Sequence, residues 1–241
     1  MKTLYHSSET RGQANHGWLN ATYSFSFANY YNPERMNFGA LRVLNDDIIA
    51  PGMGFGTHPH DNMEIITIPL EGDLEHKDSM GNIGAINQGE IQVMSAGTGV
   101  YHSEYNKSKS KPINLLQLWV MPKTQNVEPR YDQKSIIELK KNNALYQVLS
   151  PHADDDGMWI YQDAWFHLGD FDRATETEYR IKKEGNGVYL FVIEGTFKVG
   201  NKVLEQRDAF GVWEADKISF TAQAHSKLLL IDVPMFFKYI K

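Results

Sequence analysis

Two short stretches of this chain, Gly54-Phe-Gly-Thr-His-Pro-His60 and His102-Ser-Glu104, decide how the rest is interpreted. Glycine and proline crowd the approach to the first, and Gly97 and Gly99 precede the second, which argues against an α-helix at either place. The first stretch is followed by Glu64-Ile-Ile-Thr-Ile-Pro-Leu-Glu-Gly72, a β-branched run that closes on a glycine. That pattern is typical of a strand and a turn. We therefore expect both stretches to be β-strands.

The spacing of the polar residues in these stretches predicts a metal site. His58 and His60 are one residue apart, so in a strand both imidazoles point to the same face. His102 and Glu104 repeat this spacing later in the chain. If the two strands face each other, three ring nitrogens and one carboxylate meet. Imidazole and carboxylate groups together suit a divalent first-row transition metal.

Longer motifs surround these four residues and carry a family resemblance. The motifs are Gly54-Phe-Gly-Thr-His-Pro-His60, Leu70-Glu-Gly72, His76-Lys-Asp-Ser-Met-Gly-Asn82, Met94-Ser-Ala-Gly-Thr-Gly99 and His102-Ser-Glu-Tyr-Asn106. Together they resemble the pirin family of bicupins, and within it the bacterial pirin-like quercetin 2,3-dioxygenases. The resemblance is densest from Trp18 to Tyr131. It implies an all-β fold of two tandem cupin barrels (double-stranded β-helix or jelly-roll barrels) with the metal in the first.

The resemblance also ranks the acidic residues near the histidines. In many cupins the glutamate of the first motif is a ligand, whereas in the pirin pattern the acid two residues after the later histidine takes that role. Glu104 has that place, so we expect Glu104 to be the ligand and Glu64 to hold a histidine or pair within the barrel. His76 stays open as an alternative ligand, because its expected strand lies between the two pairs. Lone histidines more often make structural hydrogen bonds, and this is our first interpretation of His76 and of the others: His6, His16, His152, His167 and His225.

The activity that the resemblance implies is cleavage of a flavonol such as quercetin by O2 with release of carbon monoxide. Glu104 would accept the proton of the 3-hydroxyl group, because it lies at the metal. Iron(II) suits a site with open positions best, while nickel, copper, cobalt, manganese and zinc stay open. The alternative is a metal-binding, pirin-type regulatory protein that acts through protein partners without catalysis. Metal-dependent isomerases and lyases also use this fold.

The chain divides into two similar halves. Tyr189-Leu-Phe-Val-Ile-Glu-Gly195 echoes the strand that ends at Gly72. The offset of 123 residues between the two glycines is about half the chain, which predicts a tandem duplication. We place the N-terminal domain at residues 1–125 and the C-terminal domain at 126–241. Aligning the halves without gaps puts Ile181 and Lys183 opposite His58 and His60, so we expect no metal in the second half.

Several segments are assigned from composition. Tyr23-Ser-Phe-Ser-Phe27 alternates aromatic and polar residues like a strand. A second strand is expected over residues 38–44, ended by Asn45-Asp-Asp47, and a third, buried on both faces, over residues 113–121. Residues 122–133 are polar and read as a linker. Apolar residues near the site are mostly expected in the core, with a few lining a pocket for a flat aromatic ligand: Phe38, Met53, Phe55, Met63, Met94 and Trp119.

Amino-acid composition limits the kinds of site, cellular location and partner that we expect. The 241 residues include no cysteine, which excludes disulfides, zinc–cysteine sites and iron–sulfur clusters. Residues 1–10 lack the apolar run of a signal peptide, and no run is long enough to span a bilayer, so we expect a cytoplasmic protein. The formal net charge is −6, and the longest basic run is Lys107-Ser-Lys-Ser-Lys111, so we expect no nucleic-acid partner. The expected partners are a small aromatic substrate and O2.

Overall fold

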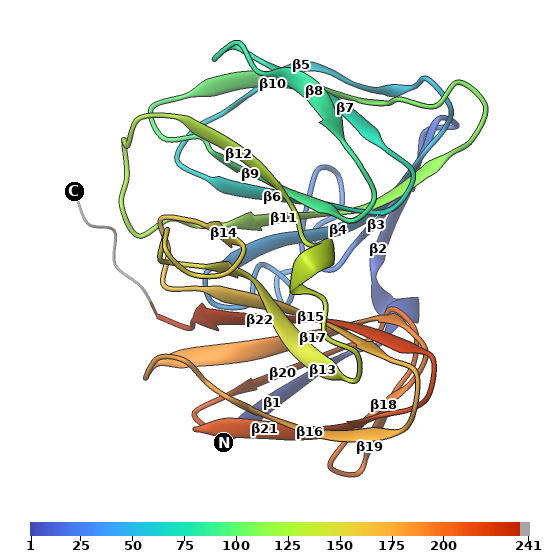
Figure 1. Cartoon of the computed structure of the whole chain (residues 1–241), viewed down its shortest axis with the longest axis vertical. Helices are drawn as coiled ribbons and strands as arrows, with labels where there is room; N and C mark the ends of the chain where they lie inside the picture. The colour runs from blue at the N-terminus through green and yellow to red at the C-terminus, as the bar shows by residue number, and fades with distance from the viewer. Residues whose placement is uncertain (237–241) are drawn as a thin grey trace.

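The chain forms two stacked β-barrels in a computed structural model that describes residues 1–236 (Figure 1). Within that range the regular elements are strands β1 to β22 and two short 3-10 helices, η1 (Ser8–Thr10) and η2 (Ile137–Leu139), with no α-helix. Each barrel joins a seven-stranded sheet to a four-stranded sheet. The expected all-β fold with two barrels is therefore confirmed. No helix among the described residues is long and apolar enough to cross a membrane.

The N-terminal barrel is built from strands between Gly12 and Ser135. Its larger sheet has the order β12-β9-β6-β11-β4-β3-β2. These strands are β2 (Gly12–Asn15), β3 (Leu19–Tyr23), β4 (Leu41–Ile49), β6 (Glu64–Glu71), β9 (Glu90–Ser95), β11 (Ile113–Val120) and β12 (Arg130–Ser135). Its smaller sheet, in the order β5-β10-β7-β8, contains β5 (Gly54–His60), β7 (Leu74–Asp78), β8 (Ile83–Ile86) and β10 (Val100–Asn106).

The C-terminal barrel repeats this plan. Its larger sheet, β1-β20-β17-β22-β15-β13-β14, contains β1 (Lys2–His6), β13 (Ala144–Ser150), β14 (Met158–Trp159), β15 (Trp165–Phe171), β17 (Asn186–Glu194), β20 (Ala209–Trp213) and β22 (Ser226–Pro234). Its smaller sheet, β16-β21-β18-β19, contains β16 (Thr175–Arg180), β18 (Phe197–Val199), β19 (Lys202–Leu204) and β21 (Lys217–Ala222). The core order β9-β6-β11-β4 matches β20-β17-β22-β15. Gly72 and Gly195 end equivalent strands in the left-handed region, at φ of 82° and 75°. Both features support the duplication.

The two barrels exchange their edge strands. β1, at the start of the chain, pairs with β20 of the C-terminal barrel, and β12 pairs with β9 of the N-terminal barrel (Figure 1). The predicted linker at residues 122–133 is thus wrong over its last part, because β12 begins at Arg130. A polar edge strand lacks the apolar alternation by which strands are recognised. The domain boundary at residues 125 and 126 falls between β11 and β12 and stays a prediction.

Two predicted strands are displaced in the structure. The strand expected over residues 23–27 lies earlier, because β3 ends at Tyr23. β4 does not end before Asn45 but continues through Asn45 and Asp47 to Ile49. Asn and Asp are frequent in turns, which suggested an end, but here tertiary contacts override that preference. On one face of β4, Asp46 accepts a hydrogen bond of 2.6 Å from Arg207 of the other barrel.

The apolar core is arranged differently in the two barrels. One cluster lies between the two larger sheets and holds the barrels together; it includes Leu44, Ile66 and Phe191. A single cluster fills the C-terminal barrel, with Phe171, Phe197 and Phe220 at its centre. In the N-terminal barrel the interior has two separate apolar clusters. The space between them is occupied by polar side chains, which is where the predicted metal residues lie.

Candidate metal centre

Strands β5 and β10 bring the three predicted histidines together. The strands are antiparallel, with His102 directly opposite His58 and Val100 opposite His60. The imidazole ring centroids of His58, His60 and His102 lie 4.4 to 4.9 Å apart. The register of the pair shifts between His102 and Glu104, which marks a β-bulge. Bulges re-aim side chains next to functional sites, and this one lies within the predicted ligand set.

The donor atoms form two overlapping groups rather than one compact quartet. His58, His60 and His102 each offer a ligand atom within 4.8 Å of one another, and so do His76, His102 and Glu104. His102 belongs to both groups. His102, Glu104 and His76 are buried, whereas His58 and His60 are half-buried. The cluster therefore has an enclosed side on β10 and a more open side on β5.

Three buried donor atoms of His102 and Glu104 are left without hydrogen bonds, a cost that a bound cation would remove. Neither ring nitrogen of His102 has a partner, and neither does Oε1 of Glu104. A buried polar atom without a partner costs about 1–3 kcal/mol. Burial, with a smaller contribution from the neighbouring histidines, lowers the pKa of His60 to about 4 and of His102 to about 3. Both rings are thus neutral at pH 7, the form of imidazole that binds metals.

Hydrogen bonds outside the cluster orient two of the donors. Nδ1 of His58 donates to the carbonyl oxygen of Gly56 at 2.8 Å, which fixes the tautomer and leaves Nε2 free for a metal. Nε2 of Gln117 donates to Oε2 of Glu104 at 2.9 Å, and the indole N–H of Trp119 reaches Oε1 of Gln117 at 3.4 Å. The Glu104 carboxylate is therefore held by one oxygen while the other stays free.

His76 is close to the cluster, but its nitrogens are already used. One donates to Oδ2 of Asp78 at 3.0 Å, and the other accepts from the side-chain amide of Gln92 at 3.1 Å. The ring also packs against Tyr131, with centroids 4.8 Å apart. The structural role expected for His76 agrees with these contacts. Its distance to His102, 5.5 Å between centroids, makes it a neighbour that shapes the site.

Glu64 lies elsewhere, and the expected contact with a site histidine is wrong. On β6 the side chains of Ile65 and Thr67 enter the barrel, so Glu64 points to the opposite face, towards the other barrel. It is 1% exposed and accepts a hydrogen bond of 2.7 Å from Oγ of Ser95. Burial raises the pKa of Glu64 to about 7, although this hydrogen bond and the charge of Arg130 act against the rise.

A cavity of about 190 Å³ opens beside the cluster and is bounded by it on one side. Its lining combines aromatic rings with polar groups: Leu19, Ala21, Tyr23, Phe27, Asn45, Asp47, Phe55, His58, His60, Glu104, Gln117 and Trp119. Of the six apolar residues named from sequence, only Phe55 and Trp119 line it. Phe38, Met63 and Met94 lie in core clusters, and Met53 is 43% exposed.

Asn45, Asp47, Gln117 and Gln92 are site residues that sequence reasoning missed. Gln117 and Gln92 carried a usable signal, because each is the polar residue inside a strand that is otherwise mainly apolar. On strands whose register is known, such residues report a polar patch inside the barrel. Asn45 and Asp47 offered no such signal, since Asn-Asp-Asp reads equally well as a turn.

The C-terminal barrel has no equivalent cluster among residues 1–236. Its strands β16 and β21 take the places of β5 and β10. Their buried positions hold Tyr179, Ile218 and Phe220, which pack in the apolar core. The residues expected opposite the histidines, Ile181 and Lys183, follow the end of β16 instead, so the ungapped alignment had slipped. That the second half holds no metal stays a prediction.

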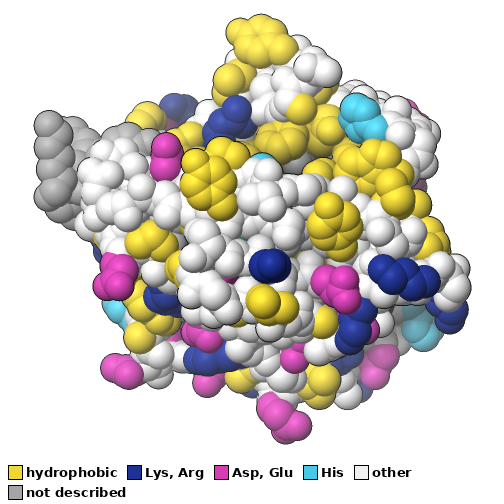
Figure 2. Space-filling view, turned by 90° about the horizontal axis from the view of Figure 1, so that it is seen from above, with side chains coloured by type: hydrophobic (Ala, Val, Ile, Leu, Met, Phe, Trp, Pro, Cys, Tyr) yellow, Lys and Arg dark blue, Asp and Glu magenta, His cyan; other side chains and the backbone are white. Residues whose placement is uncertain are grey.

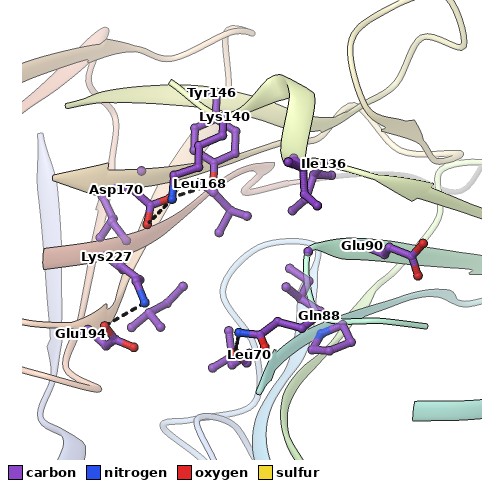
Figure 3. Close-up of a pocket in the computed structure, with 17 residues that line it drawn as sticks. Leu70, Gln88, Glu90, Ile136, Lys140, Tyr146, Leu168, Asp170, Glu194 and Lys227 are labelled. Carbon is purple, nitrogen blue, oxygen red and sulfur yellow. Dashed lines mark hydrogen bonds and ion pairs between the residues drawn. The ribbon is translucent and has the colours of Figure 1, made fainter. Parts of the chain in front are cut away.

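A second cavity, of about 350 Å³, lies between the barrels but has a different character (Figure 3). Four of its charged residues form two ion pairs. Lys140 lies 3.4 Å from Asp170, which also accepts a hydrogen bond from Tyr146, and Lys227 lies 3.0 Å from Glu194. No group of metal donors among the described residues borders it. The cavity inside the N-terminal barrel is therefore the stronger candidate for chemistry.

Comparisons with known proteins agree with this arrangement. The family described as Pirin matches residues 5–120, and the quercetinase C-terminal cupin domain matches residues 147–233. Quercetin 2,3-dioxygenase of Escherichia coli K12 is 42% identical over 224 residues, which cover 93% of this chain and 95% of that protein. A pirin-like protein of Caulobacter vibrioides is 39% identical over 222 residues, covering 92% and 95%.

Solved structures show the same relationship. The crystal structure of YhhW from Escherichia coli superposes with a TM-score of 0.92 at 40% identity, covering 98% of this chain and 99% of that one. A second structure, of the bacterial pirin YhhW from the same organism in complex with nickel(II), has a TM-score of 0.91 at 40% identity and covers 98% and 100%. The chain therefore has two cupin domains and belongs to the pirin family.

Proposed function

We propose that His58, His60, His102 and Glu104 hold one divalent transition metal ion. The unpartnered nitrogens of buried His102 and the free Oε1 of Glu104 carry this proposal. Glu104 is favoured over His76 as the fourth ligand, because both nitrogens of His76 already make hydrogen bonds. Iron(II) is the first choice for chemistry with dioxygen. Nickel(II) is the second, since a related bacterial pirin was crystallised with it.

The activity proposed for this site is dioxygen-dependent cleavage of a flavonol such as quercetin, which opens the central ring and releases carbon monoxide. The name of the relative from Escherichia coli supports this choice. The bound metal would supply a Lewis acid that orients the substrate and relays electrons towards dioxygen. Glu104 would take the hydroxyl proton of the substrate, while Gln117 holds its Oε2. Phe55 and Trp119 bound the cavity and would pack against the flat ring.

The test is turnover of quercetin under oxygen by protein loaded with iron(II), read as loss of the flavonol absorbance and as carbon monoxide released. His60→Ala and His102→Ala should abolish both signals, because each removes a donor of the cluster. Glu104→Gln should reduce them strongly, since the amide cannot take the proton. His16→Ala, an exposed histidine outside the site, is the matched control and should keep full activity. Undiminished turnover by His60→Ala would overturn the proposal.

A regulatory role without catalysis is the second candidate, and one observation favours it. Tyr101 and Tyr105 alternate with His102 and Glu104 on β10 and point outwards, with exposures of 57% and 39%. Hydrophobic side chains gather on this end of the molecule (Figure 2). Exposed apolar patches often mark interaction sites. Capture of a protein partner by the wild type but not by Tyr101→Ser, together with no flavonol turnover, would favour this candidate over the dioxygenase.

A further inference from the structure

A row of polar side chains crosses the inner face of the larger N-terminal sheet, opposite the histidine cluster. The strand register places Asn45 beside Gln117, Gln117 beside Thr67 and Thr67 beside Gln92, while Tyr23, next to Asn45, belongs to one of the apolar clusters. This polar row lies between the two apolar clusters of the barrel. Asp47 faces the same interior two residues further along β4. The inner wall facing the cluster is thus polar over several neighbouring strands.

Two of these residues line the cavity and have oxygens without a partner. Oδ1 of Asn45 and Oδ1 of Asp47 accept no hydrogen bond from the described residues, although the side chains are only 2% and 4% exposed. Oε1 of Glu104, which lines the same cavity, likewise has no hydrogen-bond partner among the described residues. Burial, Asp46 and Glu104 raise the pKa of Asp47 to about 8. A ligand that offers a hydroxyl group here would satisfy groups that the fold leaves unsatisfied.

The size of the cavity limits what can reach these oxygens. Its volume is about 190 Å³. An engineered protein cavity of about 150 Å³ binds benzene, whereas sites for drug-sized ligands span roughly 300–1,000 Å³. One six-membered ring with its substituents therefore fits between Phe55 and Trp119. The rest of a larger ligand would extend past the half-buried side of the cluster at His58 and His60.

We propose that Asn45 and Asp47 form a specificity subsite, which hydrogen-bonds a second hydroxyl group next to the substrate oxygen held at the histidine cluster. The preferred ligand then carries two neighbouring hydroxyl groups on the ring that enters the cavity, as catechols and cyclic enediols do. This inference rests on the proposed metal site, since that site holds the first oxygen. The subsite would favour ligands with a second hydroxyl group, a preference that the metal ligands alone do not explain.

The test measures binding rather than turnover. Catechol and phenol are titrated calorimetrically into protein loaded with nickel(II), without oxygen. Catechol can also chelate the metal, so the informative quantity is how a substitution changes the ratio of the two affinities. Asn45→Leu should lower that ratio about tenfold, the value of one hydrogen bond to a buried acceptor. Asn20→Leu, on the exposed face of neighbouring β3, is the matched control.

Asp47 gives a second, independent pair of variants in case Asn45→Leu does not fold. Asp47→Leu should lower the ratio, whereas Asp47→Asn keeps an acceptor oxygen and should retain most of it. A ratio that both leucine variants leave unchanged would overturn the subsite and leave the metal site standing. If loaded wild-type protein binds neither catechol nor phenol, the proposed metal-centred function fails with it. The two failures are therefore distinguishable.

Discussion

Gln117 donates a hydrogen bond of 2.9 Å to Oε2 of Glu104 and leaves Oε1 of the same carboxylate without a partner. The pair connects the larger sheet to the smaller one across the interior of the N-terminal barrel, because Gln117 lies on β11 and Glu104 on β10. A carboxylate fixed by one oxygen presents the other in a defined direction. In the proposed metal site, this hydrogen bond would hold Glu104 as the fourth donor beside the three histidines.

Replacing Gln117 should weaken metal binding without removing a ligand. Gln117→Leu frees the Glu104 carboxylate to rotate, and loss of such an outer hydrogen bond typically costs about 10- to 100-fold in metal affinity. Competition with a chelator of known affinity measures the change. Gln13→Leu, at an exposed position of β2, should bind metal like the wild type. Equal affinities for Gln117→Leu and the wild type would show that Glu104 needs no support.

Gly54 should tolerate no side chain. A Cβ atom there would lie 2.1 Å from the carbonyl oxygen of Glu104 and 2.5 Å from Cα of Tyr105, so β5 would have to move away from β10. We expect Gly54→Ala to lose about 1–3 kcal/mol of folding free energy and to bind less metal. Thermal unfolding and elemental analysis check both. Gly84→Ala on β8 is the control, because a Cβ there meets nothing within 4 Å.

The stability of the protein should fall in mild acid because of buried neutral histidines. His167 is 6% exposed, and burial lowers its pKa to about 3, from about 6.5 for an unperturbed histidine. Between these values the unfolded chain binds a proton that the folded protein does not. The contribution of neutral His167 to the free energy of unfolding is therefore complete above pH 6.5. It declines as the pH falls towards 3, by up to about 2 kcal/mol between pH 6.5 and 5.

The variant His167→Gln tests this origin. It should have a smaller difference in unfolding free energy between pH 7 and pH 5 than the wild type, whatever its stability at pH 7. Urea unfolding at the two pH values gives the comparison. His167 lies in the C-terminal barrel, away from the metal cluster, so metal binding does not complicate the result. If the wild type and His167→Gln lose the same unfolding free energy between pH 7 and pH 5, groups other than His167 cause the acid sensitivity.

The two buried glutamates should respond differently to the same substitution. Glu64→Gln should leave the metal content unchanged, because Glu64 faces the other barrel and bonds to Ser95. Glu104→Gln should lower it, since the amide is a weaker ligand than a carboxylate. Elemental analysis of both variants after loading with iron(II) makes the comparison. Metal loss in Glu64→Gln with full occupancy in Glu104→Gln would reverse the ligand assignment.

The proximity of the histidines was predictable because it depends on local spacing. Side chains two residues apart on a strand share a face, so His58 and His60 had to converge once β5 formed. The repeated strand ending at Gly72 and Gly195 likewise predicted a tandem duplication, and the family resemblance implied that each half is a barrel. The family motifs then indicated which later pair would lie opposite the first, and the register of His102 with His58 agrees with that pairing.

The surroundings of the cluster were not predictable, because they depend on register between strands distant in sequence. Gln117 reaches Glu104 only because β11 and β10 belong to facing sheets, which no local pattern reveals. In the sequence, Asn45 and Asp47 resemble a turn, whereas in the structure β4 continues through both residues. β12 was missed for a related reason: its side chains alternate little in polarity, since they lie at the edge of a sheet.

The central claim is that one metal ion lies among His58, His60, His102 and Glu104. Anomalous diffraction from crystals grown with iron(II) in the absence of oxygen tests it most directly. We expect a single strong peak about 2.0–2.2 Å from one donor atom of each of these four residues. A peak bound by His76 in place of Glu104, or a peak inside the C-terminal barrel, would contradict the account.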